Sequence, residues 1–455
     1  MKKNYSLRIV LCLLSIAILI ASCHKDSTRV TPNTSAATNT YSSSQLRNYY
    51  SLMCTITKTT PGFFPTFAAR AYGYVGIATY ESVVHGINGG MSLYGQINGL
   101  TKMPVPDAKL EYNWAISSNA AVAETMRKMF ELKITPANLA ALDSTETANL
   151  ATLSSGVSQQ VIDRSVQYGK DVAAAVYLSS TTDGGHQAYV DPFQLPYTLP
   201  VGDYCWVPTN PAVPSPVSPK WGTNRPFIAA NISNVIAVKP TDFSADASSP
   251  FYAQAMVVYN QVKNNTADQV AITKFWADDP FNTCTPAGHT FNIMIQLLKE
   301  NNATLEKASV AFAKLSIAEN DAFIACWRDK YQYDLIRPVS YIKKYIDPAF
   351  ATVIGTPAFP AYTGGHSYES GSGSMIFINM FTDGTGKYNF TDYSQLQYGF
   401  PARVYTNFND MALECANSRL YGGIHYDADN KEGLRLGRMV GDNVNKMIAW
   451  PANLK

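Results

Sequence analysis

Residues 305–338 read "LEKASVAFAKLSIAENDAFIACWRDKYQYDLIRP" and carry the clearest structural pattern in the chain. Apolar residues stand at positions 305, 308, 312, 315, 318, 322 and 325, always three or four residues apart. This spacing lines one face of an α-helix, so it predicts a helix here. On a continuous helix Lys330 and Arg337 would lie on the same side. Pro338 is expected to end or bend that helix.

The same helical periodicity recurs in three earlier segments, at 65–87, 113–133 and 157–178. Residues 203–227, in contrast, are too rich in proline to form a regular helix. We interpret this stretch as an ordered surface excursion, with a linker between two domains as the alternative. Few segments show the alternation of apolar and polar residues that is typical of β-strands. The fold is therefore expected to be all-α, with one large helical-bundle domain over 45–455.

The N-terminus predicts export. Basic residues precede an apolar run over 9–20, which is typical of a secretory signal over 1–22 and is short for a membrane span. The run ends in "IASC", which resembles the lipobox of bacterial lipoproteins, whose cysteine (here Cys23) carries a lipid. A plain signal peptide with an incidental cysteine is the alternative. Residues 23–44, rich in Ser, Thr and Asn, are expected to form a flexible tether. We therefore expect a protein that is exported and lipid-anchored to the bacterial cell envelope, at the outer membrane on its periplasmic or surface side.

The composition narrows the class of partner. The chain has 455 residues, with 36 Lys and Arg against 34 Asp and Glu, for a formal net charge of +2. A nearly neutral protein gives no reason to expect nucleic acid as a partner, so a strongly cationic site must be local. Beyond Cys12 and Cys23, five cysteines are scattered without a CxxC pair. They are expected to be small buried side chains rather than a disulfide framework.

A glycine pair stands directly before His366. Gly364 and Gly365 predict a tight turn whose backbone N–H groups can approach an anion, followed by the start of a helix. By itself this pattern is weak, because His186 and His289 also follow a glycine. Those two histidines lack the basic motifs that flank His366. They are expected to lie in loops or to support the site from outside.

Residues 418–429 read "SRLYGGIHYDAD" and hold Arg419, His425 and Asp429. Asp429 follows His425 by four residues, so its carboxylate can accept a hydrogen bond from one ring nitrogen and leave the other as a nucleophile or ligand. The glycine pair between Arg419 and His425 lets the chain turn. Taken alone, the stretch is also compatible with two helices joined by a turn, with an ordinary i,i+4 pair.

Together these segments describe a receptor for an oxyanion. Lys330, Arg337 and Arg419 supply positive charge, and the backbone near Gly364 and Gly365 supplies N–H donors. One histidine can bond the central atom and the other can transfer protons. The set suits a tetrahedral or trigonal-bipyramidal oxyanion such as phosphate or vanadate.

The motifs KxxxxxxRP (330–338), TGGH (363–366) and SRxxxxxHxxxD (418–429) resemble the signature of a known superfamily. It contains the vanadium-dependent haloperoxidases and the related acid phosphatases of the type 2 phosphatidic acid phosphatase superfamily. "FWADDPFNTCTPAGH" at 275–289 and "AARAYGYVGIATYESV" at 68–83 look like bacterial haloperoxidases in particular. The likeness therefore extends over most of the chain.

The resemblance implies the helical-bundle fold of that family and an enzyme that uses vanadate, hydrogen peroxide and a halide. Its product would be a hypohalous-acid equivalent that halogenates a small organic acceptor. Vanadium would be bonded to His425, with Asp429 as the hydrogen-bond partner of that ring, and His366 would assist proton transfer. Vanadate oxygens would be bound by Lys330, Arg337, Gly364, Gly365 and Arg419, and the halide pocket would be shaped by Trp327 and Phe359. Phosphate could occupy the same site.

One position departs from the family pattern, because Thr363-Gly364 stand where the family has Pro-Ser. A hydrogen bond from a hydroxyl to a charged group is worth about 1.5–3 kcal/mol, so weaker binding of vanadate is expected. Thr363 and Ser367 are candidates to replace the missing hydroxyl.

Two other functions stay open at this point. A phosphohydrolase would use His425 as the nucleophile that forms a phosphohistidine, with His366 protonating the leaving oxygen. A nutrient-binding lipoprotein is the second alternative, but it would need no convergent set of Lys, Arg and His.

Overall fold

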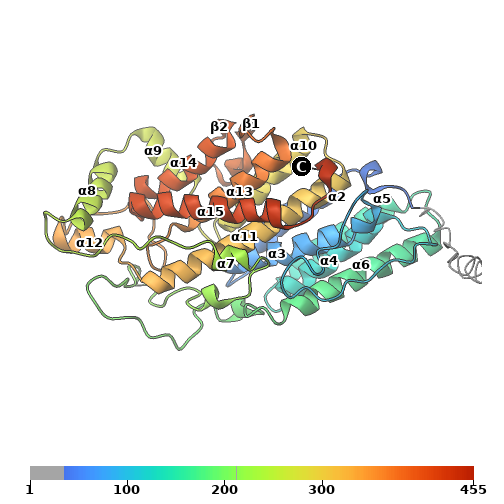
Figure 1. The fold of residues 1–455 in the computed structure, drawn as a ribbon, viewed down its shortest axis with the longest axis horizontal. Coiled ribbons are helices and arrows are strands. Elements are labelled where there is room, and N and C mark those ends of the chain that lie inside the picture. The colour runs from blue at the N-terminus through green and yellow to red at the C-terminus, as the bar shows by residue number, and fades with distance from the viewer. Residues whose placement is uncertain (1–34, 212, 455) are drawn as a thin grey trace, which may run out of the picture.

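The computed structural model describes residues 35–211 and 213–454 (Figure 1). The expected signal over 1–22 and Cys23 lie outside the described residues. Within the described ranges the chain forms fourteen α-helices and one two-stranded sheet, which confirms the all-α prediction.

The elements follow one another in chain order, with short 3₁₀ helices between them. The α-helices are α2 (Ser44–Thr59), α3 (Pro65–Glu81), α4 (Trp114–Phe130), α5 (Pro136–Leu153), α6 (Gln159–Ser180), α7 (Ala230–Ser233), α8 (Pro250–Lys263), α9 (Ala267–Phe275), α10 (Thr285–Glu300), α11 (Leu305–Tyr333), α12 (Pro338–Tyr345), α13 (Gly365–Phe381), α14 (Phe408–Tyr421) and α15 (Asp427–Met447). The 3₁₀ helices cover Thr38–Thr40, Val84–Gly86, Ala188–Val190, Trp221–Thr223, Ser394–Tyr398 and Ala452–Leu454. The strands β1 (Lys387–Asp392) and β2 (Arg403–Asn407) pair antiparallel, with Phe390 opposite Tyr405. The four segments with helical periodicity form α3, α4, α6 and α11, as predicted.

Two helices, α3 and α11, run through the centre of the fold (Figure 1). Every residue of α3 is buried, since this helix carries small and apolar side chains on all sides. The two helices approach closely because Gly76 of α3 faces Ser316 of α11. A Cβ added at Gly76 would lie 2.1 Å from Oγ of Ser316. The helices α13 and α15 pack on α11. The helices α4, α5 and α6 form a bundle at one end of the molecule, to the right in Figure 1.

The helix that begins at residue 305 ends before it reaches Arg337. Helix α11 stops at Tyr333, because Asp334 adopts a left-handed conformation with φ of 45°. Arg337 takes the N-cap position of α12, and Pro338 is the first residue of that helix. The expectation that Lys330 and Arg337 share one helix face is therefore wrong. Their side chains meet from two separate elements.

Helices α13 and α15, which carry the candidate site, approach each other through glycines. Gly433, Gly437 and Gly441 stand four residues apart on α15, so they share the face that meets α13. A Cβ added at Gly437 would lie only 2.0 Å from the backbone oxygen of Tyr368. The absence of side chains on this face lets the two backbones touch.

The tether expected over 23–44 is wrong for its described part, 35–44. Ser42 pairs with Thr304 in an isolated β-bridge, and the buried hydroxyl of Thr38 donates to the backbone oxygen of Val83 (3.2 Å). Contacts with two distant parts of the chain thus hold this segment against the body. Residues 35–44 are therefore part of the packed body.

The proline-rich segment 203–227 packs on the body, as predicted for an ordered excursion. Trp206 and Trp221 are buried, whereas Val207 between them is 49% exposed. The carbonyl oxygen of Val217 accepts a hydrogen bond from the indole of Trp327 in α11 (3.2 Å). This segment therefore packs against the central helix α11 and does not behave as a linker between two domains.

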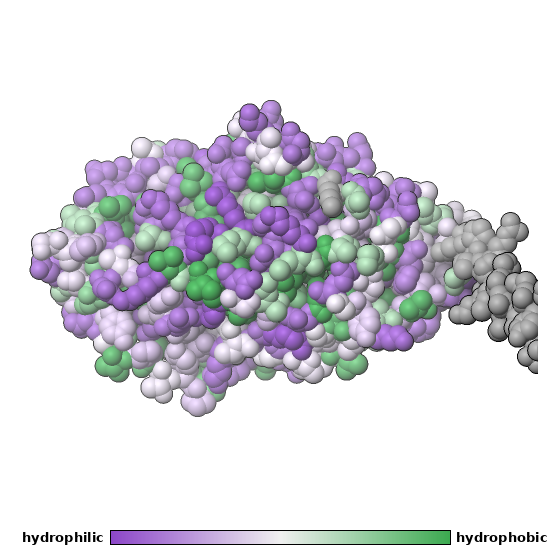
Figure 2. All heavy atoms as spheres, viewed as in Figure 1, coloured by the Kyte–Doolittle hydropathy of each residue, from purple (hydrophilic) through white to green (hydrophobic). Residues whose placement is uncertain are grey.

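The five cysteines of the described ranges are buried and free, which confirms the prediction made for them. The face shown in Figure 2 is mostly hydrophilic, with small apolar patches scattered over it. None of the helices in residues 35–211 and 213–454 combines the length and the apolar character needed to cross a bilayer.

Replacing Gly437 by Ala is expected to lower the free energy of unfolding by about 3 kcal/mol, because the new methyl group would meet a backbone oxygen that cannot turn aside. Urea unfolding followed by circular dichroism measures this change. The control is Gly355→Ala, where an added Cβ meets nothing within 4 Å. Equal stability of the two variants would contradict the close packing of α13 on α15.

Candidate active site

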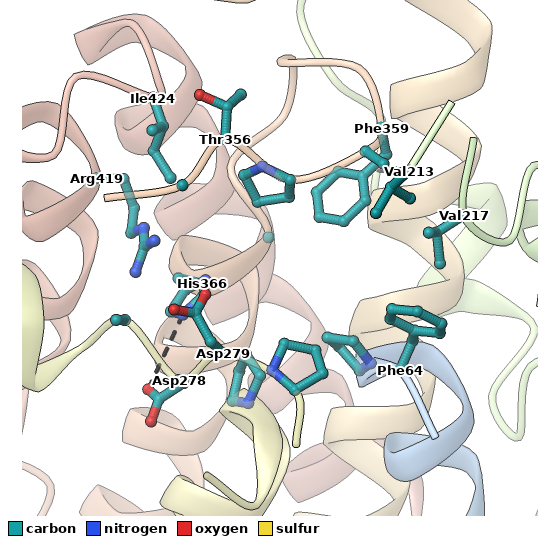
Figure 3. Close-up of a pocket in the computed structure, with 18 of the residues that line it drawn as sticks. Phe64, Val213, Val217, Asp278, Asp279, Thr356, Phe359, His366, Arg419 and Ile424 are labelled. Atoms are coloured by element: carbon teal, nitrogen blue, oxygen red, sulfur yellow. Dashed lines mark ion pairs between the residues drawn. The ribbon is translucent and has the colours of Figure 1, made fainter. Parts of the chain in front are cut away.

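A pocket of about 430 Å³ lies where α13 begins and α14 ends (Figure 3). Its walls are mostly apolar and come from the start of α3, the proline-rich segment, α11 and the loops 277–281 and 355–359. The charged and imidazole groups in its lining are Asp278, Asp279, His366, Arg419 and His425. Figure 3 shows Asp278, Asp279, His366 and Arg419 on one side and Phe64, Val213, Val217 and Phe359 on the other. Apolar walls with a few convergent polar groups are typical of sites for small molecules.

His425 is oriented through both of its ring nitrogens. Its Nδ1 lies 3.0 Å from Oδ2 of Asp429, as the i,i+4 spacing predicts. Its Nε2 lies 3.0 Å from Nη1 of Arg337, which can only donate. Burial, and then the nearby Arg337, hold the pKa of His425 well below its usual range. The ring is therefore neutral, with the proton on Nδ1 and a lone pair on Nε2.

Two buried guanidinium groups beside the pocket have unused donors. Arg337 donates from Nε to the carbonyl of Phe359 (2.9 Å) and from Nη1 to that of Ile424 (2.8 Å), but its Nη2 has no partner among the described residues. Arg419 donates from Nη1 to the carbonyl of Trp276, but its Nε likewise has no hydrogen-bond partner among the described residues. Burial lowers the pKa of Arg337 to about 9. Charged donors left unpaired in a buried place favour a bound anion.

Lys330 lies at the site, but its ammonium group binds backbone carbonyls, whereas it was expected to bind an oxyanion directly. Its Nζ donates to the carbonyls of Pro360 (3.0 Å), Ala361 (3.0 Å) and Thr363 (2.6 Å), which uses all three hydrogens of an ammonium group. Burial lowers the pKa of Lys330 to about 7. In this arrangement the side chain contributes charge to the site and holds the 360–363 backbone in place.

The start of α13 supplies the backbone donors that the glycine pair predicts. The helix begins at Gly365, and its N-cap residue Gly364 offers no side chain to the first turn. Helix α4, by comparison, is capped by the side chain of Asn113. The first N–H groups of a helix have no partner within it, and they lie at the positive end of its dipole. An uncapped helix start beside the pocket is therefore a second feature that favours an anion.

The hydroxyl missing at position 364 is not supplied by Thr363, whose Oγ1 lies 3.6 Å from Sγ of Cys326. The hydroxyl of Ser367 lies 3.4 Å from Oδ1 of Asn430. A Cβ added at Gly364 would come within 3.0 Å of both Ser367 Oγ and Asn430 Oδ1. A side chain at this position would therefore be crowded against α15.

His366 faces the pocket with a nitrogen that has no hydrogen-bond partner in the described residues. Nε2 of the ring lies 3.9 Å from Oδ2 of Asp278. Burial, and then the charge of Arg419, hold the pKa of His366 well below its usual range. The imidazole is therefore neutral and can accept a proton.

Two carboxylates of the site were given no role by the sequence analysis. Asp278 and Asp279 line the pocket from the loop after α9 (Figure 3). Their signal in the sequence is two consecutive acidic residues inside the aromatic stretch "FWADDPF", an unfavourable place for charge unless it has a partner. Burial raises the pKa of Asp279.

Trp327 and Phe359 form an aromatic wall of the pocket, where the halide pocket is expected. Their ring centroids are 4.8 Å apart, and the planes are inclined by 54°. Nζ of Lys330 lies 5.1 Å from the centre of the Phe359 ring, and Cζ of Arg337 lies at the same distance. The structure thus brings together all the site residues expected from the sequence that lie in the described ranges.

Binding of an oxyanion is expected to weaken as the pH rises. Lys330, with a pKa of about 7, loses its charge above pH 7, and Asp429, whose pKa burial raises to about 7, gains negative charge over the same range. A bound anion favours charged Lys330, so binding takes up protons. The Kd of sulfate, which does not titrate here, should therefore rise roughly tenfold between pH 6 and pH 8. Isothermal titration calorimetry measures this.

The matched variant is Lys330→Met, which should bind sulfate more weakly and lose much of the pH dependence. A sulfate affinity of the unchanged protein that stays constant from pH 6 to pH 8 would contradict the charge changes at Lys330 and Asp429.

Comparisons with known proteins identify similar chains and folds. A model of the VCPO second helical-bundle domain matches residues 310–348 and 345–452. Among solved structures, a bacterial vanadium-dependent iodoperoxidase is 30% identical, with a TM-score of 0.81 over 90% of this chain and 97% of that one. Holo and apo forms of a bacterial vanadium-dependent chloroperoxidase share the fold at 12% and 14% identity, with TM-scores of 0.64 over 86% of this chain and 93% and 95% of theirs. No curated protein sequence gives a significant match.

The match to the iodoperoxidase spans nearly the whole length of both chains at 30% identity. The chain belongs to the vanadium-dependent haloperoxidase family.

Proposed function

We propose that this protein is a vanadate-dependent haloperoxidase, which oxidises a halide with hydrogen peroxide to a hypohalous-acid equivalent. One observation carries the proposal: Nη2 of Arg337 and Nε of Arg419 are buried without a partner in the described ranges. Leaving a buried donor unpaired costs about 1–3 kcal/mol, and more for a charged group. Both donors belong to the same site as the lone pair of His425.

The residues at the site suit a vanadate ion. Nε2 of His425 carries the lone pair that would bond the vanadium, and its hydrogen bond to Arg337 would be given up. The guanidinium groups of Arg337 and Arg419 and the first turn of α13 would hold the oxygens, while Lys330 adds charge from behind. Bound vanadate supplies Lewis-acid chemistry, which polarises the peroxide without a change in oxidation state. Phosphate has a similar shape and charge and is expected to compete.

His366 is the residue that we assign to proton transfer. Nε2 of its neutral ring has no hydrogen-bond partner among residues 35–211 and 213–454, and the carboxylate of Asp278 lies 3.9 Å from it. A neutral imidazole accepts a proton from the peroxide, and an adjacent carboxylate stabilises the resulting positive charge. The apolar walls limit access of water, which strengthens the electrostatic interactions inside.

We assign the halide to the aromatic wall formed by Trp327 and Phe359. Iodide is the expected halide, because the 30% identical structure is an iodoperoxidase and iodide is the most easily oxidised of iodide, bromide and chloride. A small organic acceptor would meet the oxidised halide in the same pocket. We also propose that the protein is exported and held at the bacterial envelope by a lipid on Cys23, on the strength of the lipobox pattern.

The phosphatase alternative would use the same histidines, with His425 as nucleophile. The likeness to the iodoperoxidase over nearly the whole chain favours the haloperoxidase. No feature of the described residues specifically favours phosphate ester hydrolysis.

The purified protein, freed of phosphate and loaded with orthovanadate, is expected to oxidise iodide with hydrogen peroxide, measured as triiodide formation. His425→Ala removes the group that would bond vanadium, so the rate should fall by at least about 100-fold, or roughly 3 kcal/mol. The control His186→Ala changes a histidine outside the pocket and should leave the rate within about twofold.

Turnover of p-nitrophenyl phosphate by the vanadate-free protein is measured alongside. Phosphate ester hydrolysis that depends on His425, together with no iodide oxidation at any vanadate concentration, would mean that the protein is a phosphatase.

A further inference from the structure

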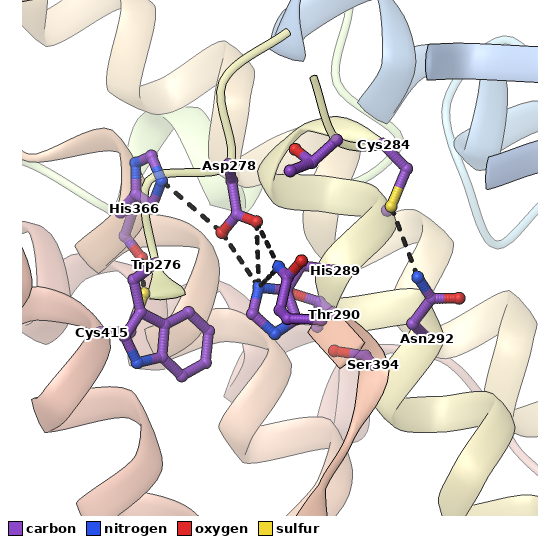
Figure 4. Close-up of polar contacts among 12 residues, drawn as sticks. Trp276, Asp278, Cys284, His289, Thr290, Asn292, His366, Ser394 and Cys415 are labelled. Atoms are coloured by element: carbon purple, nitrogen blue, oxygen red, sulfur yellow. Dashed lines mark hydrogen bonds and ion pairs between the residues drawn. The ribbon is translucent and has the colours of Figure 1, made fainter. Parts of the chain in front are cut away.

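His289 of α10 lies behind the pocket, beneath the loop that carries Asp278 (Figure 4). Its side chain is only 1% exposed, and both ring nitrogens face carboxylates. Nδ1 lies 3.0 and 3.1 Å from the two oxygens of Asp278, and Nε2 lies 2.9 Å from Oδ2 of Asp392. Carboxylate oxygens accept hydrogen bonds, so a ring with a proton on each nitrogen, an imidazolium, satisfies both Asp278 and Asp392. The amide nitrogen of Gln395 also lies 2.8 Å from Nδ1.

The two carboxylates are held in place by further donors. The side-chain amide of Gln395 donates to Oδ1 of Asp278 (2.7 Å), and the backbone nitrogen of Ser394 donates to Oδ1 of Asp392 (2.9 Å). The indole of Trp276 stacks on the His289 ring, with centroids 4.4 Å apart and planes inclined by 22°. The cation is thus fixed in position and in orientation.

The opposite charges in this cluster stabilise the charged forms of His289 and Asp392. Burial disfavours a charged His289, but Asp278 and Asp392 raise its pKa to about 10. Burial likewise disfavours a charged Asp392, but the adjacent His289 and the hydrogen bonds from Ser394 bring its pKa below the usual value. A cation between two anions leaves one net negative charge next to the site.

Asp278 connects this cluster to the pocket. One side of its carboxylate faces His289, and Oδ2 lies 3.9 Å from Nε2 of His366 (Figure 4). The charged groups that face His366 are Asp278 from the 276–280 loop, Arg419 from α14, Lys330 from α11 and His289 from α10. Asp278 is the carboxylate within 4.0 Å of the His366 ring in the described ranges, so its position affects how well a protonated His366 is stabilised.

We propose that His289 is a positioning residue for proton transfer at His366: held between Asp278 and Asp392, it fixes the Asp278 carboxylate in the orientation that faces Nε2 of His366. This inference rests on the proposed haloperoxidase function. His289 touches neither the pocket nor a substrate, so it acts only through Asp278. Without it, the two buried carboxylates would lack their shared cation, and Asp278 would lose the contact that fixes its orientation.

The step that His289 supports is the transfer of one proton. A peroxide oxygen keeps the electron pair of its O–H bond, and the proton goes to Nε2 of His366. Asp278 then faces an imidazolium on each side, His289 and His366. Oxidation of the halide follows this step, so a defect at His289 should slow the use of peroxide and leave the use of halide nearly intact.

The first test varies peroxide and iodide separately with the vanadate-loaded variant His289→Gln, a neutral side chain that still forms hydrogen bonds. The value of kcat/KM for peroxide should fall about 10- to 100-fold, and that for iodide should stay within about threefold. Equal losses in both would mean that His289 has a structural role only, and would overturn the proposal. The control His186→Gln should change neither value.

Asp392→Asn is the matched variant, because it leaves His289 paired with Asp278. It should keep kcat/KM for peroxide within about threefold of the unchanged protein. A loss as large as that of His289→Gln would show that the whole cluster acts as a structural unit, and would overturn the proposal.

A second measurement needs no vanadate and no variant. The ¹⁵N signals of labelled histidine rings in the vanadate-free protein should show His289 protonated on both nitrogens from pH 6 to pH 9. A neutral ring at pH 7 would overturn this inference alone. Absence of any iodide oxidation by the unchanged, vanadate-loaded protein would instead overturn the proposed function, and the assignment of His289 with it.

Discussion

The burial of three cations around one pocket is the constraint on which the rest of the structure depends. Lys330, Arg337 and Arg419 are at most 2% exposed, and none forms an ion pair within 4.0 Å in the described part of the chain. Moving a cation from water into a protein interior costs several kcal/mol unless polar groups replace the water. Here backbone carbonyls do so in part, because all three side chains donate to them. Carbonyl dipoles leave the net positive charge in place, and an anion is the partner that neutralises it.

The fold delivers these charges from separate rigid elements. Lys330 stands near the end of α11, Arg337 at the start of α12 and Arg419 in the last turn of α14. The glycine-lined contact of α15 with α13 then sets the uncapped start of α13 beside the turn that carries His425, and the backbone nitrogen of Gly364 donates to the carbonyl of Asp429 (2.9 Å). No one element contains the site; the packing of five helices, α11 to α15, creates it.

Patterns that are local in sequence predicted local structure well. The periodicity of 305–325, the helix start at Gly365 and the pairing of His425 with Asp429 all follow from spacings of four residues or fewer. The geometry of Arg337 could not be predicted in this way, because a single left-handed residue at Asp334 ends α11 and redirects the chain. Such a residue has no strong sequence signal when it is an aspartate rather than a glycine.

Contacts between distant segments were beyond the reach of the sequence. The cluster of Asp278, His289 and Asp392 joins a loop, a helix and a strand separated by up to 114 residues, and nothing in the individual segments predicts that they meet. The packing of residues 35–44 on the body was missed for the same reason, since Ser42 pairs with the distant Thr304. Polar composition predicted a tether, whereas long-range backbone pairing decided the outcome.

The close contact of α13 and α15 divides the site into a part that cannot change and a part that can. A backbone oxygen 2.0 Å from the position of a missing Cβ leaves no room for substitution at Gly437, so the segment that positions His366 and His425 tolerates little variation. The apolar walls, in contrast, come largely from the loops 277–281 and 355–359 and from the proline-rich segment. Loops tolerate substitutions that would disrupt the contact between two closely packed helices. Selection, in nature or in the laboratory, can therefore reshape the acceptor pocket residue by residue while the oxyanion receptor stays as it is.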